Sequence, residues 1–414
     1  MAASMNRRTF LRSAIGSGAA AALGSLGGLP GRTAYASRES TPAEAHRRKL
    51  IVVVFGGGTR SSESIHDPEH RYIPHLWNEM VPRGTLFTNM RVEHKVVHPN
   101  CTGSILTGHW EWDDIDWSRP VTHPTIFEIY RKARGAPDTA AWAFVYASIL
   151  AKAGESLSPG YGPGFAANVV EPPTIDRSTA EEMDRLLRRA AASGSIQAEL
   201  AAARRCEHLA RSTSRIARGG LQSQAARAFL DREHETWKSA SGTTSHDAFL
   251  TDRAIACMRT FAPDVMAVAY GEIDCAHYGS WSRYVEAIRR TDQLTWRLWR
   301  ATYEIDDYRD RTLMLILPDH GRELDVPGRW GFIHHSDFYT NEGADEGCRR
   351  VWMLALGPGF KAGRKIPGPA PITAAAATGL EHLGLTASSA AAPSVASLIA
   401  RRPLRSLQVP ARMG

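Results

Sequence analysis

The hydrophobic residues of this chain gather into short runs, and glycine, proline or polar residues separate one run from the next. Residues 50–55 form an unbroken run that ends at three glycines, a pattern typical of a strand buried on both faces of a sheet. Further strands are expected at 85–90, 139–146, 265–270, 313–317 and 351–356, and helices at 72–83, 100–106, 125–134 and 284–303. This alternation predicts an α/β fold with a central, mostly parallel sheet flanked by helices.

One long segment departs from this alternation. Residues 178–260 are rich in alanine, arginine, glutamate and leucine, and glycines interrupt them near Gly194 and Gly219. The composition favours a helical insertion. We expect this insertion to lie within one α/β domain spanning 49–414, which a polar, basic linker at 37–48 precedes.

The first 36 residues have the composition of an export signal rather than of a folded domain. The pair Arg7 and Arg8 precedes a weakly hydrophobic stretch rich in alanine and glycine, and the Ala-Tyr-Ala sequence at 34–36 fits a cleavage site. These features predict a twin-arginine signal and a periplasmic or secreted protein. No later segment holds about 18 uninterrupted apolar residues, so the mature protein is not expected to be embedded in a membrane.

Charge and cysteine content bear on the class of partner and on the redox chemistry. The formal net charge is +7, but part of the excess lies in the first 50 residues and no nucleic-acid-binding motif is present, so no nucleic-acid partner is expected. The five cysteines are odd in number and no pair has zinc-ribbon spacing. One or two disulfides could form in an oxidising compartment, and the sequence leaves their pairing open.

Acidic and histidine side chains follow two of the expected buried strands, and a histidine pair comes shortly afterwards. These residues are Asp274, His277, Asp319, His320, His334 and His335. Because ligands bind beyond the carboxyl ends of the strands in such sheets, we expect these side chains to converge there. Carboxylates and imidazoles together are the ligands of a hydrolytic metal site, and zinc is the expected ion, with manganese and calcium as alternatives.

The order and spacing of these residues resemble the second half of enzymes of the alkaline phosphatase superfamily, with sulfatases and nucleotide pyrophosphatase/phosphodiesterases as the nearest relatives. The resemblance covers residues 50–110 and 264–361, and it includes a Leu-Thr-Gly sequence at 106–108. It implies an alkaline phosphatase-like fold and two metal ions. The first ion would be held by Asp274, His277 and either His334 or His335, and the second by Asp319, His320, an aspartate after the first strand and the nucleophile.

One departure from the family pattern concerns the second ion. The family aspartate after the first strand is missing, and Gly56, Gly57 and Gly58 stand there instead. The nearest carboxylate is that of Glu63, so either Glu63 substitutes as a ligand or the second ion is weakly bound or absent. The glycines are consistent either with a tight turn or with a backbone nest for an anion.

A second departure concerns the nucleophile. Counted as in the phosphodiesterases and sulfatases, the family position falls on His98, and counted as in the phosphopentomutases it falls on Ile105, so neither register gives a hydroxyl group. We choose Thr102 as the nucleophile, because a hydroxyl in the first turn of a helix gains from the positive helix end. Arg60 or Arg322 is expected to stabilise charge on the oxygens of the substrate.

These features together predict an exported, metal-dependent hydrolase that acts on phosphate or sulfate esters of small molecules. The missing aspartate and hydroxyl favour an alternative, a catalytically degenerate relative that kept the metal and acts as a binding protein. The oligomeric state and the identity of the ester stay open at this point.

Overall fold

The computed structural model describes residues 48–172, 177–213, 222–239, 245–336, 344–386 and 392–396. The export signal expected at 1–36 lies outside these residues, as does the linker expected at 37–48 except for its last residue.

The centre of the molecule is a nine-stranded sheet with the strand order β4-β3-β5-β1-β6-β7-β2-β8, in which β9 also pairs with β2. Among the described residues, β7 runs antiparallel to both of its neighbours, and the other pairings are parallel. The predicted fold class is therefore confirmed. The strands are β1 (Lys49–Val54), β2 (Thr85–Arg91), β3 (Ala141–Val145), β4 (Asn168–Val170), β5 (Val265–Ala269), β6 (Thr312–Leu317), β7 (Arg350–Leu356), β8 (Arg364–Ile366) and β9 (Ala370–Pro371).

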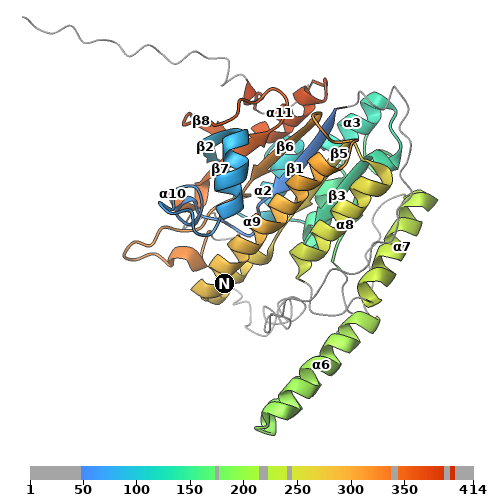
Figure 1. The fold of residues 1–414 in the computed structure, drawn as a ribbon, viewed down its shortest axis with the longest axis vertical. Coiled ribbons are helices and arrows are strands. Elements are labelled where there is room, and N and C mark those ends of the chain that lie inside the picture. The colour runs from blue at the N-terminus through green and yellow to red at the C-terminus, as the bar shows by residue number, and fades with distance from the viewer. Residues whose placement is uncertain are drawn as a thin grey trace, which may run out of the picture.

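Helices cover the sheet on both faces, as Figure 1 shows. The helices are α2 (His98–Thr107), α3 (Ile126–Arg134), α4 (Ser148–Ala151), α5 (Arg177–Ala192), α6 (Ile196–Thr213), α7 (Gln224–Ser239), α8 (His246–Phe261), α9 (Trp281–Glu304), α10 (Glu346–Arg349) and α11 (Ala374–His382). Shorter turns are η2 (Ser61–Glu63), η3 (Leu76–Met80), η4 (Val81–Arg83), η5 (Asp138–Ala140), η6 (Lys152–Gly154), η7 (Glu272–Tyr278) and η8 (Gly331–Ile333).

The central strand β1 divides the interior into two cores, because successive side chains of a strand point to opposite faces. Leu50, Val52 and Val54 pack in one core with residues of α2, α3 and α11. Ile51 and Val53 pack in the other core with residues of α7, α8 and α9. Burial on both faces explains why the strand reads as an unbroken apolar run.

Two parts of the fold differ in form from the simplest sequence expectation. In the segment 72–83, where a helix is expected, the chain forms the π-helical turn η3 and the 3₁₀ turn η4, and Pro82 at the start of η4 has no amide hydrogen to continue a regular ladder. The stretch 178–260 contains α5 to α8, of which α8 packs against the sheet beside α9. Helix α6 extends away from the sheet layers (Figure 1).

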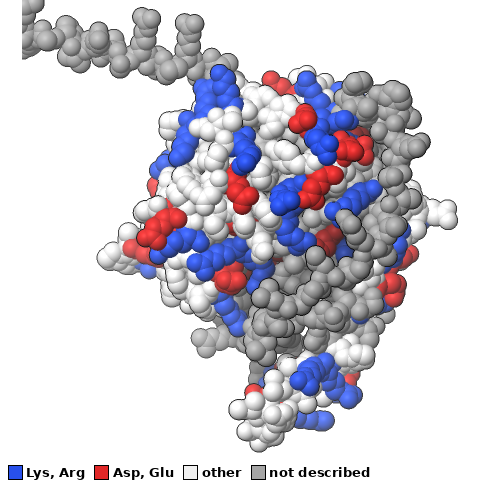
Figure 2. Space-filling model, in the orientation of Figure 1, with Lys and Arg blue, Asp and Glu red and all other residues white. Residues whose placement is uncertain are grey.

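Among the described residues on the face drawn in Figure 2, no patch carries charges of a single sign. Lysine and arginine alternate there with aspartate and glutamate. Within the described residues, no helix is both long and apolar enough to cross a membrane.

Candidate metal centre

Three neighbouring strands deliver the residues of the candidate site. β1 lies between β5 and β6 and is parallel to both, so their carboxyl ends meet at one edge of the sheet. A loop of three glycines (Gly56, Gly57 and Gly58; the glycine loop) follows β1. The η7 turn follows β5, and the segment 318–322 follows β6. The edge is the place where α/β sheets bind ligands, as the sequence led us to expect.

The η7 turn presents Asp274 and His277 on the same side. A 3₁₀ turn has three residues per turn, so residues three apart lie one above the other. The Asp274 Oδ1 atom lies 3.1 Å from the His277 Nε2 atom. The entry into the turn is held by the buried carboxylate of Asp247 on α8, which accepts hydrogen bonds from the backbone amides of Gly271 and Glu272.

His98, the first residue of α2, lies between the carboxylates of two strand-end aspartates. Its Nδ1 atom is 2.5 Å from Asp319 Oδ2 and its Nε2 atom is 2.9 Å from Asp274 Oδ1. Burial by itself lowers the pKa of His98, but attraction to the two carboxylates outweighs burial and raises that pKa to about 10. In the metal-free protein the imidazole is therefore a cation that bridges the two carboxylates.

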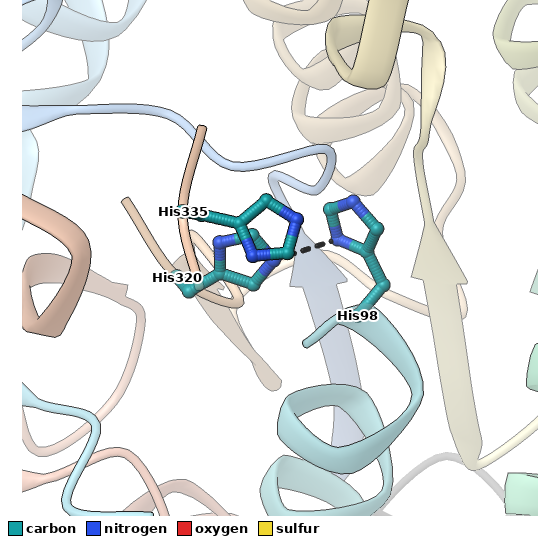
Figure 3. Close-up of side chains that lie close together, drawn as sticks. All are labelled: His98, His320 and His335. Carbon is teal, nitrogen blue, oxygen red and sulfur yellow. Dashed lines mark hydrogen bonds between the residues drawn. The ribbon is translucent and has the colours of Figure 1, made fainter. Parts of the chain in front are cut away.

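The imidazoles of His320 and His335 lie next to His98, and together with Asp274, His277 and Asp319 these side chains are called the cluster below. His320 Nε2 lies 3.0 Å from His98 Nδ1, and His335 is buried against both rings. Figure 3 shows the three rings facing one another, with His98 at the end of its helix and His320 and His335 opposite. One ligand atom from each of the three rings lies within 4.8 Å of the others, and the same holds for Asp274, His277 and His335.

The orientation of the imidazoles fits a metal ion. His277 Nδ1 lies 2.9 Å from the Ile333 carbonyl oxygen, and His335 Nδ1 lies 2.6 Å from that of Val96. Each Nδ1 must donate its hydrogen there, so each Nε2 carries a lone pair. These two Nε2 atoms face one another at 3.1 Å. Two lone pairs at this distance repel unless a cation lies between them.

The donor set has the chemistry of a hydrolytic metal site. Two imidazoles and one carboxylate, with a position left for a ligand, are the ligands typical of catalytic zinc. Tetrahedral zinc with ordinary Zn–N bonds places two nitrogens about 3.3 Å apart, close to the 3.1 Å between His277 Nε2 and His335 Nε2. Hydrogen bonds from the other ring nitrogens to backbone carbonyls are the usual support of such ligands. The residues Asp274, His277 and His335 therefore fit a divalent ion.

Electrostatics favour the ligand forms of the remaining groups. Burial lowers the pKa of His320 to about 3 and also lowers the pKa of His335, so both rings stay neutral near pH 7. Burial acts to raise the pKa of Asp319, but the neighbouring His320 and His98 more than offset this and lower it to about 2. Neutral imidazoles and ionised carboxylates are the forms that bind metals.

Several residues singled out in the sequence lie elsewhere. Both carboxylate oxygens of Glu63 accept hydrogen bonds from the Arg60 guanidinium, and Tyr284 Oη also donates to this carboxylate. The Arg60 guanidinium donates in addition to the carboxylate of Asp325. Glu63 is therefore held in a buried ion pair with Arg60 and is not one of the clustered side chains.

The structure also shows where the two histidines, His334 and His335, and the hydroxyl group of Thr102 lie. Of the two histidines, His335 joins the cluster, whereas His334 lies 3.1 Å from the Glu323 carboxylate. The hydroxyl of Thr102, one helical turn beyond His98, is buried and has no hydrogen-bond partner within the described part of the chain. The imidazole of His98 is thus the α2 side chain that contacts Asp319.

Sequence reasoning missed two residues next to the cluster. Tyr146 follows β3 directly and stands edge-on to the His98 ring, with ring centroids 6.4 Å apart. Asp247 supports the η7 turn from α8. Tyr146 could have been found from the rule that strand ends carry the site, because it follows a buried strand of the same sheet. Asp247 gave no such signal, because its role depends on a contact between distant segments.

Comparisons with known proteins define the class of fold. No protein-family model matches the sequence, and a search of curated proteins found no match. A solved sulfatase structure shows that the chain has the fold of that enzyme. At these low identities the likeness establishes the fold.

Two solved structures illustrate this similarity. Ps i-CgsB aligns over 82% of this chain and 73% of its own, with 14% identity and a TM-score of 0.52. The PsFucS1 sulfatase from Pseudoalteromonas sp. aligns over 83% of this chain and 69% of its own, with 12% identity and a TM-score of 0.50.

Proposed function

We propose that this protein is an exported, metal-dependent hydrolase of phosphate or sulfate esters. One observation carries the proposal: the Nε2 atoms of His277 and His335 face each other at 3.1 Å while their Nδ1 atoms bond to backbone carbonyls, and Asp274 lies beside them. Such a preformed donor set at the carboxyl edge of the sheet is suited to a catalytic ion.

The similar structures support an ester of this kind. PsFucS1 is named as a sulfatase, and Ps i-CgsB has been crystallised with k-i-k-neocarrahexaose. Both properties are those of the neighbours. For this chain they support a search that starts with sulfate and phosphate esters, including those of sugars.

The residues of the chain have separable roles in the proposed reaction. A divalent ion bound by Asp274, His277 and His335 would polarise a phosphoryl or sulfuryl oxygen. The imidazolium of His98, held by two carboxylates, donates a proton to the leaving ester oxygen. Water provides the hydroxyl group that phosphorus or sulfur gains, so atoms and charge balance. The proton that this water releases returns His98 to its charged form, and the Asp319 carboxylate keeps the ring in place and stabilises its charge.

Metal analysis and hydrolysis test this proposal together. Protein dialysed against zinc is expected to hold about one equivalent of ion or more and to hydrolyse at least one of nitrophenyl phosphate, bis-nitrophenyl phosphate and nitrophenyl sulfate. His335→Ala should lower kcat/KM by more than about 100-fold, because even the loss of a partner behind a ligand costs 10- to 100-fold. His75→Gln, which changes a histidine outside the cluster, should leave kcat/KM unchanged.

Two variants separate the roles of His98 and Thr102. His98→Asn should abolish hydrolysis of esters with poor leaving groups, because the proton donor is lost. Thr102→Val should retain activity, since the hydroxyl is buried and makes no hydrogen bond within the described residues. Loss of activity in Thr102→Val with activity retained in His98→Asn would assign the attack to the hydroxyl instead.

A binding protein remains the second candidate function. It is favoured by the position of His98 where related enzymes carry a hydroxyl nucleophile, and by the pairing of Glu63 with Arg60. A protein that holds metal and binds inorganic phosphate or sulfate, but hydrolyses none of the esters, would establish this alternative.

A further inference from the structure

Arg322 is the charged side chain buried most deeply at the candidate site, with 0% of its surface exposed. It follows β6 by a few residues, as part of the same segment as Asp319 and His320. Its Nη2 atom donates to the Gly57 carbonyl and to Asp274 Oδ1, at 2.7 and 2.9 Å, and its Nε atom donates to the Gly58 carbonyl. Three bonds from two directions hold the guanidinium rigidly.

The Nη1 group of the same guanidinium is buried and has no hydrogen-bond partner within the described part of the chain. An unpaired buried donor is costly, and more so when it is charged, so native proteins leave one only where water, an ion or a ligand supplies the acceptor. The planar guanidinium keeps Nη1 close to Nη2, which contacts the metal-site carboxylate of Asp274. The unpaired donor therefore lies beside the metal position.

The glycine loop has no side chain that could occupy the space around the Arg322 guanidinium. A Cβ atom on Gly58 would lie 2.9 Å from His320 Cε1 and 3.0 Å from Arg322 Nε, so no larger side chain from the loop can enter. The nearest carboxylate in the sequence, Glu63, is paired with Arg60. A fixed positive charge thus lies where a second divalent ion would need a further carboxylate ligand.

The charge and the dipoles around Arg322 favour an oxyanion. Asp274, Asp319, Arg322 and the charged His98 together carry no net charge, and a single divalent ion gives the site two positive charges. The positive end of α2 is adjacent, because its first residue His98 contacts both carboxylates.

We propose that Arg322 binds an oxygen of a tetrahedral oxyanion, either a phosphate or a sulfate group, and that its guanidinium takes the place of a second metal ion. The site then holds the anion between one divalent ion and Nη1. This inference concerns the site of the proposed hydrolase, but it is tested by binding rather than by turnover.

Calorimetric titration of the zinc-loaded protein with inorganic phosphate, and separately with sulfate, tests the proposal. Wild-type protein should bind at least one anion, and the stronger of the two identifies the ester class. Arg322→Met should weaken that binding about tenfold or more, the usual effect of losing a hydrogen bond between charged groups. Arg322→Lys keeps the positive charge but not the planar guanidinium, so its anion affinity should lie between those of the wild-type protein and Arg322→Met. Arg131→Met removes a buried arginine that bonds to the Ala166 carbonyl on another part of the fold, and should leave anion affinity unchanged.

A second measurement needs no variant and so does not depend on whether Arg322→Met folds. Zinc content of the wild-type protein, dialysed against zinc and then freed of excess ion, should be about one per chain. Two ions per chain, no binding of either anion, or unchanged anion affinity in Arg322→Met or Arg322→Lys would each overturn the inference. Arg322-dependent anion binding without any ester hydrolysis would uphold it and refute the proposed hydrolase.

Discussion

At the scale of single residues, the glycines after β1 matter through the space they leave. Gly57 and Gly58 have φ angles of +97° and +78°, which residues other than glycine rarely adopt. The carbonyl oxygens of Gly57 and Gly58 in the same loop accept hydrogen bonds from the Arg322 guanidinium. The loop therefore both leaves room for the guanidinium and fixes it through these two backbone carbonyls.

Gly58→Ala is expected to weaken zinc binding. Its Cβ atom would approach His320 and Arg322 to about 3 Å, so both side chains must shift, and the positive φ costs about 1–2 kcal/mol in addition. Calorimetric zinc titration and urea unfolding would measure the two effects. Gly359→Ala is the matched control, because Gly359 has a φ of +92° with no atom within 4 Å of the new Cβ. Equal zinc affinity in both variants would contradict the expectation.

His98 should give the metal-free protein a characteristic pH dependence. Its folded pKa of about 10 lies above the ordinary value of 6.5. The ion pairs of His98 therefore stabilise the fold fully below about pH 6.5, and this stabilisation is lost as pH rises through about 10. Urea unfolding of wild-type and His98→Gln protein, with chelator present, should show a stability difference that shrinks between pH 7 and pH 10. A difference that grows over this range would show that His98 is not charged in the folded protein.

At the scale of secondary-structure elements, the positions of the candidate metal ligands depend on how their turns are anchored. The η7 turn carries Asp274 and His277 at the spacing of one 3₁₀ turn, and α8 anchors it through Asp247. Helix α2 carries His98 at its first position, where the ring lies beyond the helix and not along its side. In both η7 and α2, the candidate ligands lie at or near an end of the element. A shift of that end would therefore move these side chains.

Asp247→Ala is expected to weaken zinc binding without removing a ligand. The variant leaves the amides of Gly271 and Glu272 without their acceptor, which costs about 1–3 kcal/mol of stability and loosens η7. Thermal unfolding and zinc titration would detect this. Asp252→Ala on the same helix removes a partly exposed pair with Arg297 and should change stability by about 1 kcal/mol or less. The prediction is wrong if the two variants bind zinc equally well.

At the scale of the whole molecule, the site is an assembly of segments far apart in the chain. His98 from α2, Asp274 from the turn after β5 and Asp319 from the segment after β6 meet because β5, β1 and β6 are adjacent in the sheet. The two hydrophobic cores hold these strands in register from both faces. Formation of the candidate metal site therefore requires the folded sheet.

Export itself can be tested on the full chain. Arg7→Lys together with Arg8→Lys should leave the protein in the cytoplasm, because the twin-arginine route depends on the arginine pair. Cell fractionation followed by immunodetection would show the location. Arg47→Lys together with Arg48→Lys is the control, since it changes a basic pair outside the signal without changing charge. The same periplasmic yield for both double variants would exclude a twin-arginine signal.

The sequence by itself determined the sheet and the edge at which the site forms. Buried strands such as 50–55 and 313–317 can be recognised in the sequence because burial on both faces requires unbroken apolar residues. Asp274, His277 and His320 could be proposed as ligands because each follows such a strand, and the ends of adjacent strands meet.

Only the tertiary structure decided which side chains join the cluster. Consecutive residues of an extended segment point to opposite sides, so the choice of His335 over His334 depends on the Val96 carbonyl, far away in the chain. The pairing of Glu63 with Arg60, the unpaired Nη1 of Arg322 and the bridging position of His98 follow in the same way from contacts across the sheet edge. Local patterns of polarity carry no information on such contacts, because each depends on the relative placement of separate elements.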